Sequence, residues 1–153
     1  MQAGAQLIDS NILIRWVKPD DRDYDLVNSV IDGLLRQGIT LCYTSQNLGE
    51  FWNACTRPVD KNGYGLSTAD ADFRAKLIED RLNLLDDSAA VHKEWRRIIV
   101  RYSVSGVQVH DARLVAAMRV HGVKQILTFN DRDFARYSDI QALNPGTLLQ
   151  ENP

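Results

Sequence analysis

The sequence predicts an α/β fold, a three-layer α/β/α sandwich with a mainly parallel central sheet. Short apolar segments of strand length alternate with amphipathic segments of helical length along most of the chain. No two-residue hairpin turn separates the predicted strands, so their connections must cross over as they do in parallel sheets. The chain of 153 residues suits one domain with a single core, and residues 1–153 contain no internal repeat, low-complexity tract or second domain.

The predicted strands are short apolar segments, each bounded by glycine, charged or other polar residues, as expected of buried strands. They cover residues 5–8, 39–43, 82–85, 125–129 and 140–143. A helix is predicted between the first two strands, over residues 25–37. It carries apolar residues at i, i+4 and i+8 and ends at Gly38.

The next helix is expected to begin with Ser45 as its cap. It should end before Arg57-Pro58, because a residue that precedes proline disfavours the helical backbone. Residues 60–67 then form a polar, glycine-containing loop. The helix that follows is expected to bury an apolar side made of Phe73, Leu77 and Ile78.

The second half of the chain continues the alternation of strands and helices. A helix is predicted over residues 89–102, and a turn follows over residues 103–109. Asp111 then opens a helix that closes at Gly122, a residue type common just after helix C-termini.

Composition and charge restrict the classes of function. No apolar run reaches the roughly 20 residues of a membrane span, and the N-terminus lacks the regions of a signal peptide, so a cytoplasmic location is expected. Cys42 and Cys55 are isolated in apolar patterns and are expected to be reduced core residues. The formal net charge of −2 argues against a broad basic surface for nucleic acid, though not against a local site.

Two carboxylates in the first third of the chain are candidate functional groups. Asp9 directly follows the first strand, at the sheet edge where open α/β proteins bind ligands. It can also be interpreted as a turn residue that caps a helix beginning near Asn11. Glu50 lies opposite the apolar side of its helix, so a solvated surface glutamate is the natural alternative to a ligand. Asn47 would share its polar face.

The second half supplies further oxygen ligands in comparable positions. Asp111 can be an N-cap or a metal ligand, and the two roles are compatible because one carboxylate oxygen stays free. The segment 128–134 again places polar side chains after an apolar strand, although an ordinary strand-to-helix turn would look the same. Mg²⁺ and Mn²⁺ prefer oxygen ligands of this kind, so the pattern predicts a divalent-cation site.

The ordered motifs resemble those of PIN-domain ribonucleases, in particular the VapC-like toxins of bacterial toxin–antitoxin pairs. The motifs are Leu-Ile-Asp9-Ser-Asn11, Asn47-Leu-Gly-Glu50-Phe, Val-His-Asp111-Ala-Arg-Leu-Val-Ala-Ala and Leu-Thr128-Phe-Asn130-Asp-Arg-Asp133-Phe, which together span most of the chain. The resemblance implies Mg²⁺- or Mn²⁺-dependent hydrolysis of RNA. It also implies that Asp9, Glu50 and Asp111 are the three core acids, both catalytic and metal-binding.

The last motif departs from the family pattern. An acid often stands two residues after its threonine, and here that position is Asn130. Asn130 can still coordinate a cation through its carbonyl, and Asp131 and Asp133 lie close by in the sequence. Asp133 could supply the missing charge, so Asn130 and Asp133 join the predicted metal ligands, with one or two cations bound. Thr128 or Ser10 could hydrogen-bond a ligand carboxylate.

Two other function classes remain open. A metal-independent ribonuclease could use His110 and His121 as acid and base, although they belong to opposite ends of one helical segment. The second class is a catalytically inactive PIN-like module that binds a partner. Retained cleavage with a chelator would favour the first, and absence of metal binding the second.

The segment from residue 60 to residue 81 predicts an interaction surface. It contains more apolar residues than a loop and helix exposed to solvent would need. They are Tyr64, Leu66, Phe73 and Leu77. The family resemblance adds that such toxins commonly form homodimers, with the tail of a small antitoxin protein lying across the acidic pocket.

Overall fold

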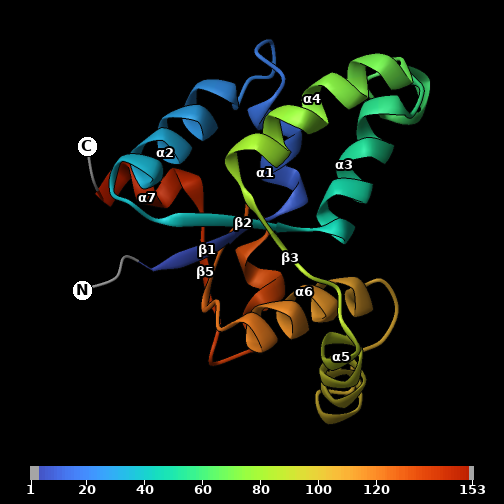
Figure 1. Ribbon diagram of the computed structural model, residues 1–153, viewed down its shortest axis with the longest axis vertical. Coiled ribbons are helices and arrows are strands. Elements are labelled where there is room, and N and C mark those ends of the chain that lie inside the picture. Colours follow the sequence, from blue (N-terminus) through green and yellow to red (C-terminus); the bar gives the residue numbers. More distant parts are fainter. Residues whose placement is uncertain (1–3, 152–153) are drawn as a thin grey trace.

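The computed structural model describes residues 4–151, which form a five-stranded sheet covered by helices on both faces (Figure 1). The strand order is β3-β2-β1-β4-β5, and every neighbouring pair is parallel. The strands are β1 (Ala5–Ile8), β2 (Thr40–Thr44), β3 (Asn83–Leu85), β4 (Gln125–Leu127) and β5 (Gln141–Leu143). The three-layer α/β/α prediction is therefore confirmed, with strand boundaries displaced by one or two residues after β1.

One face of the sheet carries most of the helices. These are α1 (Ser10–Trp16), α2 (Tyr24–Arg36), α3 (Ser45–Thr56), α4 (Thr68–Arg81) and α7 (Pro145–Glu151), with a short 3₁₀ helix at Val59–Lys61 after α3. The opposite face carries α5 (Ala89–Arg101) and α6 (Gln108–His121), as Figure 1 shows. Helix α7 was not among the predicted elements, and α1 was expected only under the alternative interpretation of Asp9 as a cap, with a start near Asn11. Within residues 4–151, no helix is long and apolar enough to cross a membrane.

The sheet separates two apolar cores because successive strand residues point to opposite faces. Ile8 and Leu127 belong to the core under α1–α4, whereas Leu7 and Ile126 belong to the core under α5 and α6. Leu7 stands in register with Cys42 on one side and Ile126 on the other. The central strand is thus fixed from both neighbours, and its C-terminal residue has a defined position. Both cysteines are buried and free, as expected.

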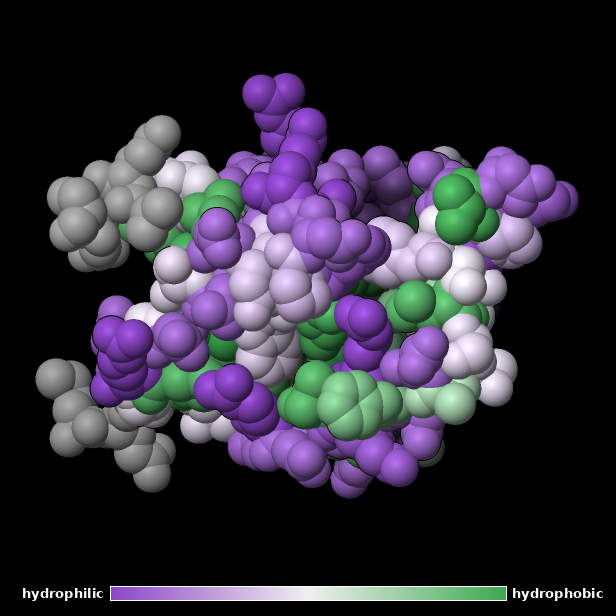
Figure 2. All heavy atoms as spheres, turned by 90° about the horizontal axis from the view of Figure 1, so that it is seen from above, coloured by the Kyte–Doolittle hydropathy of each residue, from purple (hydrophilic) through white to green (hydrophobic). Residues whose placement is uncertain are grey.

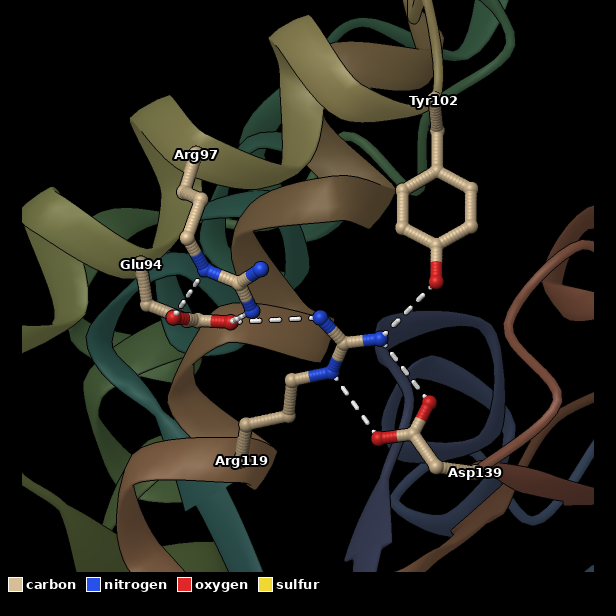
Figure 3. A network of polar contacts seen from close by, with 5 residues as sticks. All are labelled: Glu94, Arg97, Tyr102, Arg119 and Asp139. Carbon is tan, nitrogen blue, oxygen red and sulfur yellow. Dashed lines mark hydrogen bonds and ion pairs between the residues drawn. The ribbon is translucent and has the colours of Figure 1, made fainter.

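A polar network fastens the layer of α5 and α6 to the turn before β5 (Figure 3). Arg119 on α6 donates two bonds of 2.9 Å to Asp139, one of 3.2 Å to Glu94 and one of 3.3 Å to the hydroxyl of Tyr102. Arg97 donates to Glu94 from the same side. The charge-assisted bonds of Arg119, whose side chain is 17% exposed, contribute about 1.5–3 kcal/mol each where they are sheltered and less toward solvent. The network therefore stabilises the helix that carries Asp111.

Helix α4 buries a different side from the one predicted. Phe73 is 65% exposed and Leu77 43% exposed, whereas Ala71, Ala75 and Ile78 are buried. The inward positions are spaced by four and three residues, as a helix requires, and small alanines allow α4 to approach the adjacent helix α3. The prediction was right only for Ile78.

Two helix starts also differ from the prediction. The cap of α3 is Thr44, whose hydroxyl accepts from the Asn47 amide at 3.1 Å while the Asn47 side chain accepts from the Thr44 amide at 2.9 Å. This reciprocal capping box shifts the start by one residue from Ser45. Helix α6 begins at Gln108, because Gly106 ends the preceding turn with φ +63°. Asp111 therefore lies inside the first turn and does not open the helix.

Candidate active site

The strand order reverses at the centre of the sheet. From β1 the chain moves outward through β2 to β3, and β4 then starts on the other side of β1. In open α/β sheets, ligands bind at such a reversal, beyond the carboxyl ends of the strands. Asp9 follows β1 and Thr128 follows β4 directly, and the Asp9 amide donates to the Leu127 carbonyl at 3.0 Å. The first and fourth motifs therefore meet at the expected ligand edge.

Asp9 is buried, with 7% of its surface exposed, and both of its carboxylate oxygens are held in place. One oxygen accepts from the Ser10 amide at 2.7 Å, which caps α1. The other accepts from the Thr128 hydroxyl at 2.8 Å and from the Asn11 side chain at 3.4 Å. Burial raises the pKa of Asp9, while the bonds from Thr128 and Ser10 oppose this rise. Asp9 therefore caps α1, and its carboxylate also has a fixed orientation at the ligand edge of the sheet.

Thr128 and Asn11 hold Asp9 and the segment after β4 in place. Thr128 is completely buried, and its hydroxyl accepts from the Asn11 side chain at 3.2 Å and from the Asn130 amide at 3.0 Å. The side-chain amide oxygen (Oδ1) of Asn11 in turn accepts from the Phe129 amide at 3.1 Å. These bonds join the start of α1 to the segment after β4, so the carboxylate of Asp9 has little freedom to reorient. The predicted bond from Thr128 to a candidate ligand is present.

Glu50 lies at the rim of a hollow that Asp9 and Asn11 also line. It is exposed, as the surface interpretation required, and one of its oxygens accepts from the Ser10 hydroxyl at 3.3 Å and from Gln46 at 3.3 Å. Ser10 accepts from the buried side chain of Asn47 at 3.2 Å. Asn47 therefore supports Ser10 from below and does not share the solvated face of Glu50, contrary to expectation.

Asp111 reaches the hollow from α6, on the other side of the sheet edge. Burial, and then the charges of Asp9, Asp133 and Glu50, raise the pKa of Asp111 to about 7. None of the ion pairs in residues 4–151 involves this carboxylate. Three acids distant in the sequence therefore line one hollow, and none of them forms an ion pair within the described residues.

The polar residues of the fourth motif have different neighbours. Asn130 lines the hollow, and the charge of Asp133 acts on both Asp9 and Asp111. Asp131 accepts a bond of 3.2 Å from Asn144 on the C-terminal side. Of the candidates for the fourth position, Asn130 lines the hollow and Asp133 is near enough for its charge to act on the acids, whereas Asp131 is bonded to Asn144.

The hollow has a volume of about 300 Å³. It is lined by Asp9, Ser10, Asn11, Ile14, Glu50, Asn53, Ala54, Arg57, Asp111 and Asn130. Within residues 4–151, no three acidic, histidine or cysteine side chains approach closely enough to ligate one ion directly. Mg²⁺ usually takes only one or two carboxylates and keeps several waters. The oxygen-rich donor set and the room around it fit a hydrated cation of this type.

His110 and His121 do not converge on one site. His110 lies in the first turn of α6 and His121 is its last residue, so they are separated by about 16 Å along the helix. The His121 ring contacts the Asp86 carbonyl at 2.9 Å, away from the hollow. A catalytic acid and base must both reach the bond that is cleaved. Two histidines at opposite ends of one helix cannot do so.

A family model described as the PIN domain matches residues 7–140. The chain belongs to the PIN domain family. No curated protein sequence matches the chain.

Solved structures with the same fold include toxin–antitoxin proteins. A chain of the DNA-bound VapBC structure from Salmonella typhimurium superposes with a TM-score of 0.67 at 17% identity, covering 94% of this chain and 98% of that one. VapC20 of Mycobacterium tuberculosis, a sarcin-ricin loop cleaving toxin, gives 0.62 at 15% identity, covering 86% and 94%. PAE2754 from Pyrobaculum aerophilum gives 0.63 at 17% identity, covering 99% and 96%. At these identities the likeness concerns the fold.

Sequence reasoning missed three polar residues of this PIN domain that line the hollow. Asn11 braces Asp9 and the fourth motif, and Asn53 and Arg57 extend the hollow along α3. The signal for the last two was present, because they stand three and seven residues after Glu50, which places them on its face of the helix.

Proposed function

We propose that this PIN domain is an Mg²⁺- or Mn²⁺-dependent endoribonuclease that hydrolyses RNA phosphodiester bonds as the toxin of a toxin–antitoxin pair. The observation that carries the proposal is the convergence of Asp9, Glu50 and Asp111 on one hollow at the reversal of the strand order. An oxygen-lined pocket whose three acids form no ion pair suits a cation, and a bound cation makes the pocket attractive to a phosphate. The fold shared with VapC20 supports the choice of RNA as substrate.

Each residue has a role that follows from its contacts. Asp9 and Asp111 would hold the cation, with Asn130 and Asp133 flanking it. When bound, such a cation polarises the phosphate and lowers the pKa of a water. Thr128 keeps Asp9 oriented through the 2.8 Å bond. Glu50 on the exposed rim, positioned by Ser10, completes the ligand set or accepts the proton of the attacking water.

Metal-dependent cleavage is the direct test. The purified protein should cleave single-stranded or looped RNA with Mg²⁺ or Mn²⁺, stop when a chelator is added, and recover when excess cation is restored. Calorimetry should detect cation binding at the same concentrations. Cleavage that persists in chelator would exclude the metal mechanism. A protein that binds no cation and leaves RNA intact would instead be the inactive interaction module.

The partner surface proposed for this toxin lies over α1, α2 and α4. Figure 2 views the molecule from this side and shows hydrophobic surface exposed between hydrophilic side chains. The exposed Phe73 and Leu77 belong to α4, and a hollow of about 210 Å³ lies beside Leu77. Its walls include Trp16, Val17, Pro19, Tyr24, Asn28 and Arg81. Exposed apolar side chains around a hollow are typical of a surface that another chain covers.

Assembly can be measured directly. We expect a homodimer by light scattering at micromolar concentration, and inhibition of cleavage by a small antitoxin with an apolar, basic segment. An arginine of that segment would pair with Asp9 and Glu50 and compete with the cation. Phe73→Glu should weaken these associations, whereas Val100→Glu, at a 70% exposed position on α5, should not. A monomeric mass would reject the dimer, and undiminished cleavage with the product of the adjacent gene would reject the inhibition.

A further inference from the structure

The acidic hollow continues as a groove between α1 and α3, which pack side by side (Figure 1). The α3 wall is a helical stripe at i, i+3, i+4 and i+7. It consists of Glu50, Asn53, Ala54 and Arg57. The α1 wall consists of Ser10, Asn11 and Ile14. Acids therefore occupy one end of the groove, and a single arginine occupies the other.

Arg57 is not neutralised by any neighbour. No ion pair in residues 4–151 involves it. Its Nη2 donates to the Asn62 carbonyl at 2.8 Å, while its Nε is buried without a hydrogen-bond partner. Arg15 on the facing helix differs, because it pairs with Asp23 at 3.4 Å and lies over the Phe129 ring. The guanidinium charge of Arg57 therefore has no carboxylate partner and remains available to an anion bound in the groove.

The backbone around Arg57 is fixed. The following proline ends α3 at Thr56, and the Arg57 carbonyl accepts from the Gly65 amide at 2.9 Å. Gly63 lies so close that a Cβ there would be 2.0 Å from the Arg57 carbonyl oxygen. The bond to Asn62 then holds the guanidinium toward the loop. Arg57 is thus held at the end of the groove by local structure and not by a charge partner.

We propose that Arg57 binds a phosphate of the RNA strand adjacent to the scissile phosphate, and that the strand follows the groove between α1 and α3. This inference rests on the proposed ribonuclease function. Arg57 stands seven residues after Glu50, about 10 Å along the helix axis, so it reaches a different phosphate from the one at the acids. A guanidinium presents paired donors that match phosphate oxygens. The other walls of the groove are neutral or acidic, so Arg57 is the residue there that attracts a polyanion.

The test is the salt dependence of RNA binding. Affinity for a fluorescent single-stranded oligoribonucleotide is measured in chelator in an Asp111→Asn background, so that the strand is not cleaved during the measurement. Arg57→Gln should weaken binding about 10-fold and make the slope of log K against log salt shallower by about 0.7, the value for one phosphate contact on a single strand. Arg57→Lys should retain most of the slope because its charge remains. Arg36→Gln, an 82% exposed arginine at the end of α2, should change neither quantity.

The outcomes separate the two proposals. Unchanged affinity and slope in Arg57→Gln, with a parent protein that cleaves and binds RNA, would overturn the Arg57 inference alone. A parent that neither binds nor cleaves RNA would overturn the ribonuclease function and this inference with it. An equal loss of slope in Arg36→Gln would show general charge attraction and reject the phosphate contact.

A second measurement does not depend on the folding of Arg57→Gln. The Nε–H signal of Arg57, assigned by its absence in Arg57→Lys, is followed by NMR in the Asp111→Asn protein during addition of the oligoribonucleotide. The signal should shift, because a phosphate bound by the same guanidinium changes the electronic environment of its Nε–H. A signal that stays in place at saturating RNA would overturn the inference.

Discussion

Replacing Asp111 with asparagine is expected to lower RNA cleavage about 10³-fold while the protein stays folded. The substitution removes a ligand charge but keeps the shape of the side chain. A bound cation contributes several kcal/mol to stabilising a transition state at phosphorus, and about 4 kcal/mol corresponds to this factor. Asp111 lies inside the first turn of α6, where its side chain does not cap the helix. Its loss therefore removes no bond that holds the fold.

Single-turnover cleavage and far-ultraviolet circular dichroism check this result together. Asp25→Asn is the matched control, because Asp25 is an exposed acid of α2 outside the hollow, and its variant should cleave at the parental rate. If Asp111→Asn cleaves as fast as the parent, Asp111 is not a ligand. Loss of the circular dichroism signal would instead assign it a structural role.

The architecture was predictable because strand and helix periods are properties of local sequence. The apolar segment before Asp9 and the stripe of residues 25–37 both became the expected elements. Helix α1 was expected only as part of the alternative interpretation of Asp9, because Asp9-Ser10-Asn11 resembles a polar turn and the polar start of α1 is the site itself. The predicted start of the helix containing Asp111 was too late, because Val107 looks like an apolar residue of the preceding turn. The side chain of Val107 is 82% exposed.

The site was predictable to the extent that parallel strands present their carboxyl ends at one edge. This rule locates Asp9 and the segment after β4. It says nothing about Glu50, whose position depends on the tilt of α3 and on the bond from Ser10. Nor does it reveal that Asn47 is buried while Arg57 keeps an unpartnered Nε, because hydrogen-bond partners are set by tertiary contacts.

Asp111→Asn is also expected to make the metal-free protein more stable above pH 7. The pKa of Asp111 is raised from 3.8 to about 7 in the folded state. A raised carboxyl pKa means that the folded state binds the proton more tightly than the unfolded state. The contribution of Asp111 to the free energy of unfolding is therefore full below about pH 4 and is lost as the pH rises through about 7. Above that, the ionised carboxylate opposes folding.

The difference between parent and variant isolates this effect from other titrating groups. In chelator at pH 8, denaturant unfolding should show Asp111→Asn more stable by about 1–2 kcal/mol, a value reduced for solvent screening of a partly exposed carboxylate. At pH 4 the two proteins should be nearly equal. Saturating Mg²⁺ should stabilise the parent through binding to the folded state and leave the variant largely unchanged. A variant less stable than the parent at pH 8 in chelator would mean that the Asp111 carboxylate has a favourable partner. In that case, the charge at this position would belong to the fold, and the cation would have to be held by the other acids.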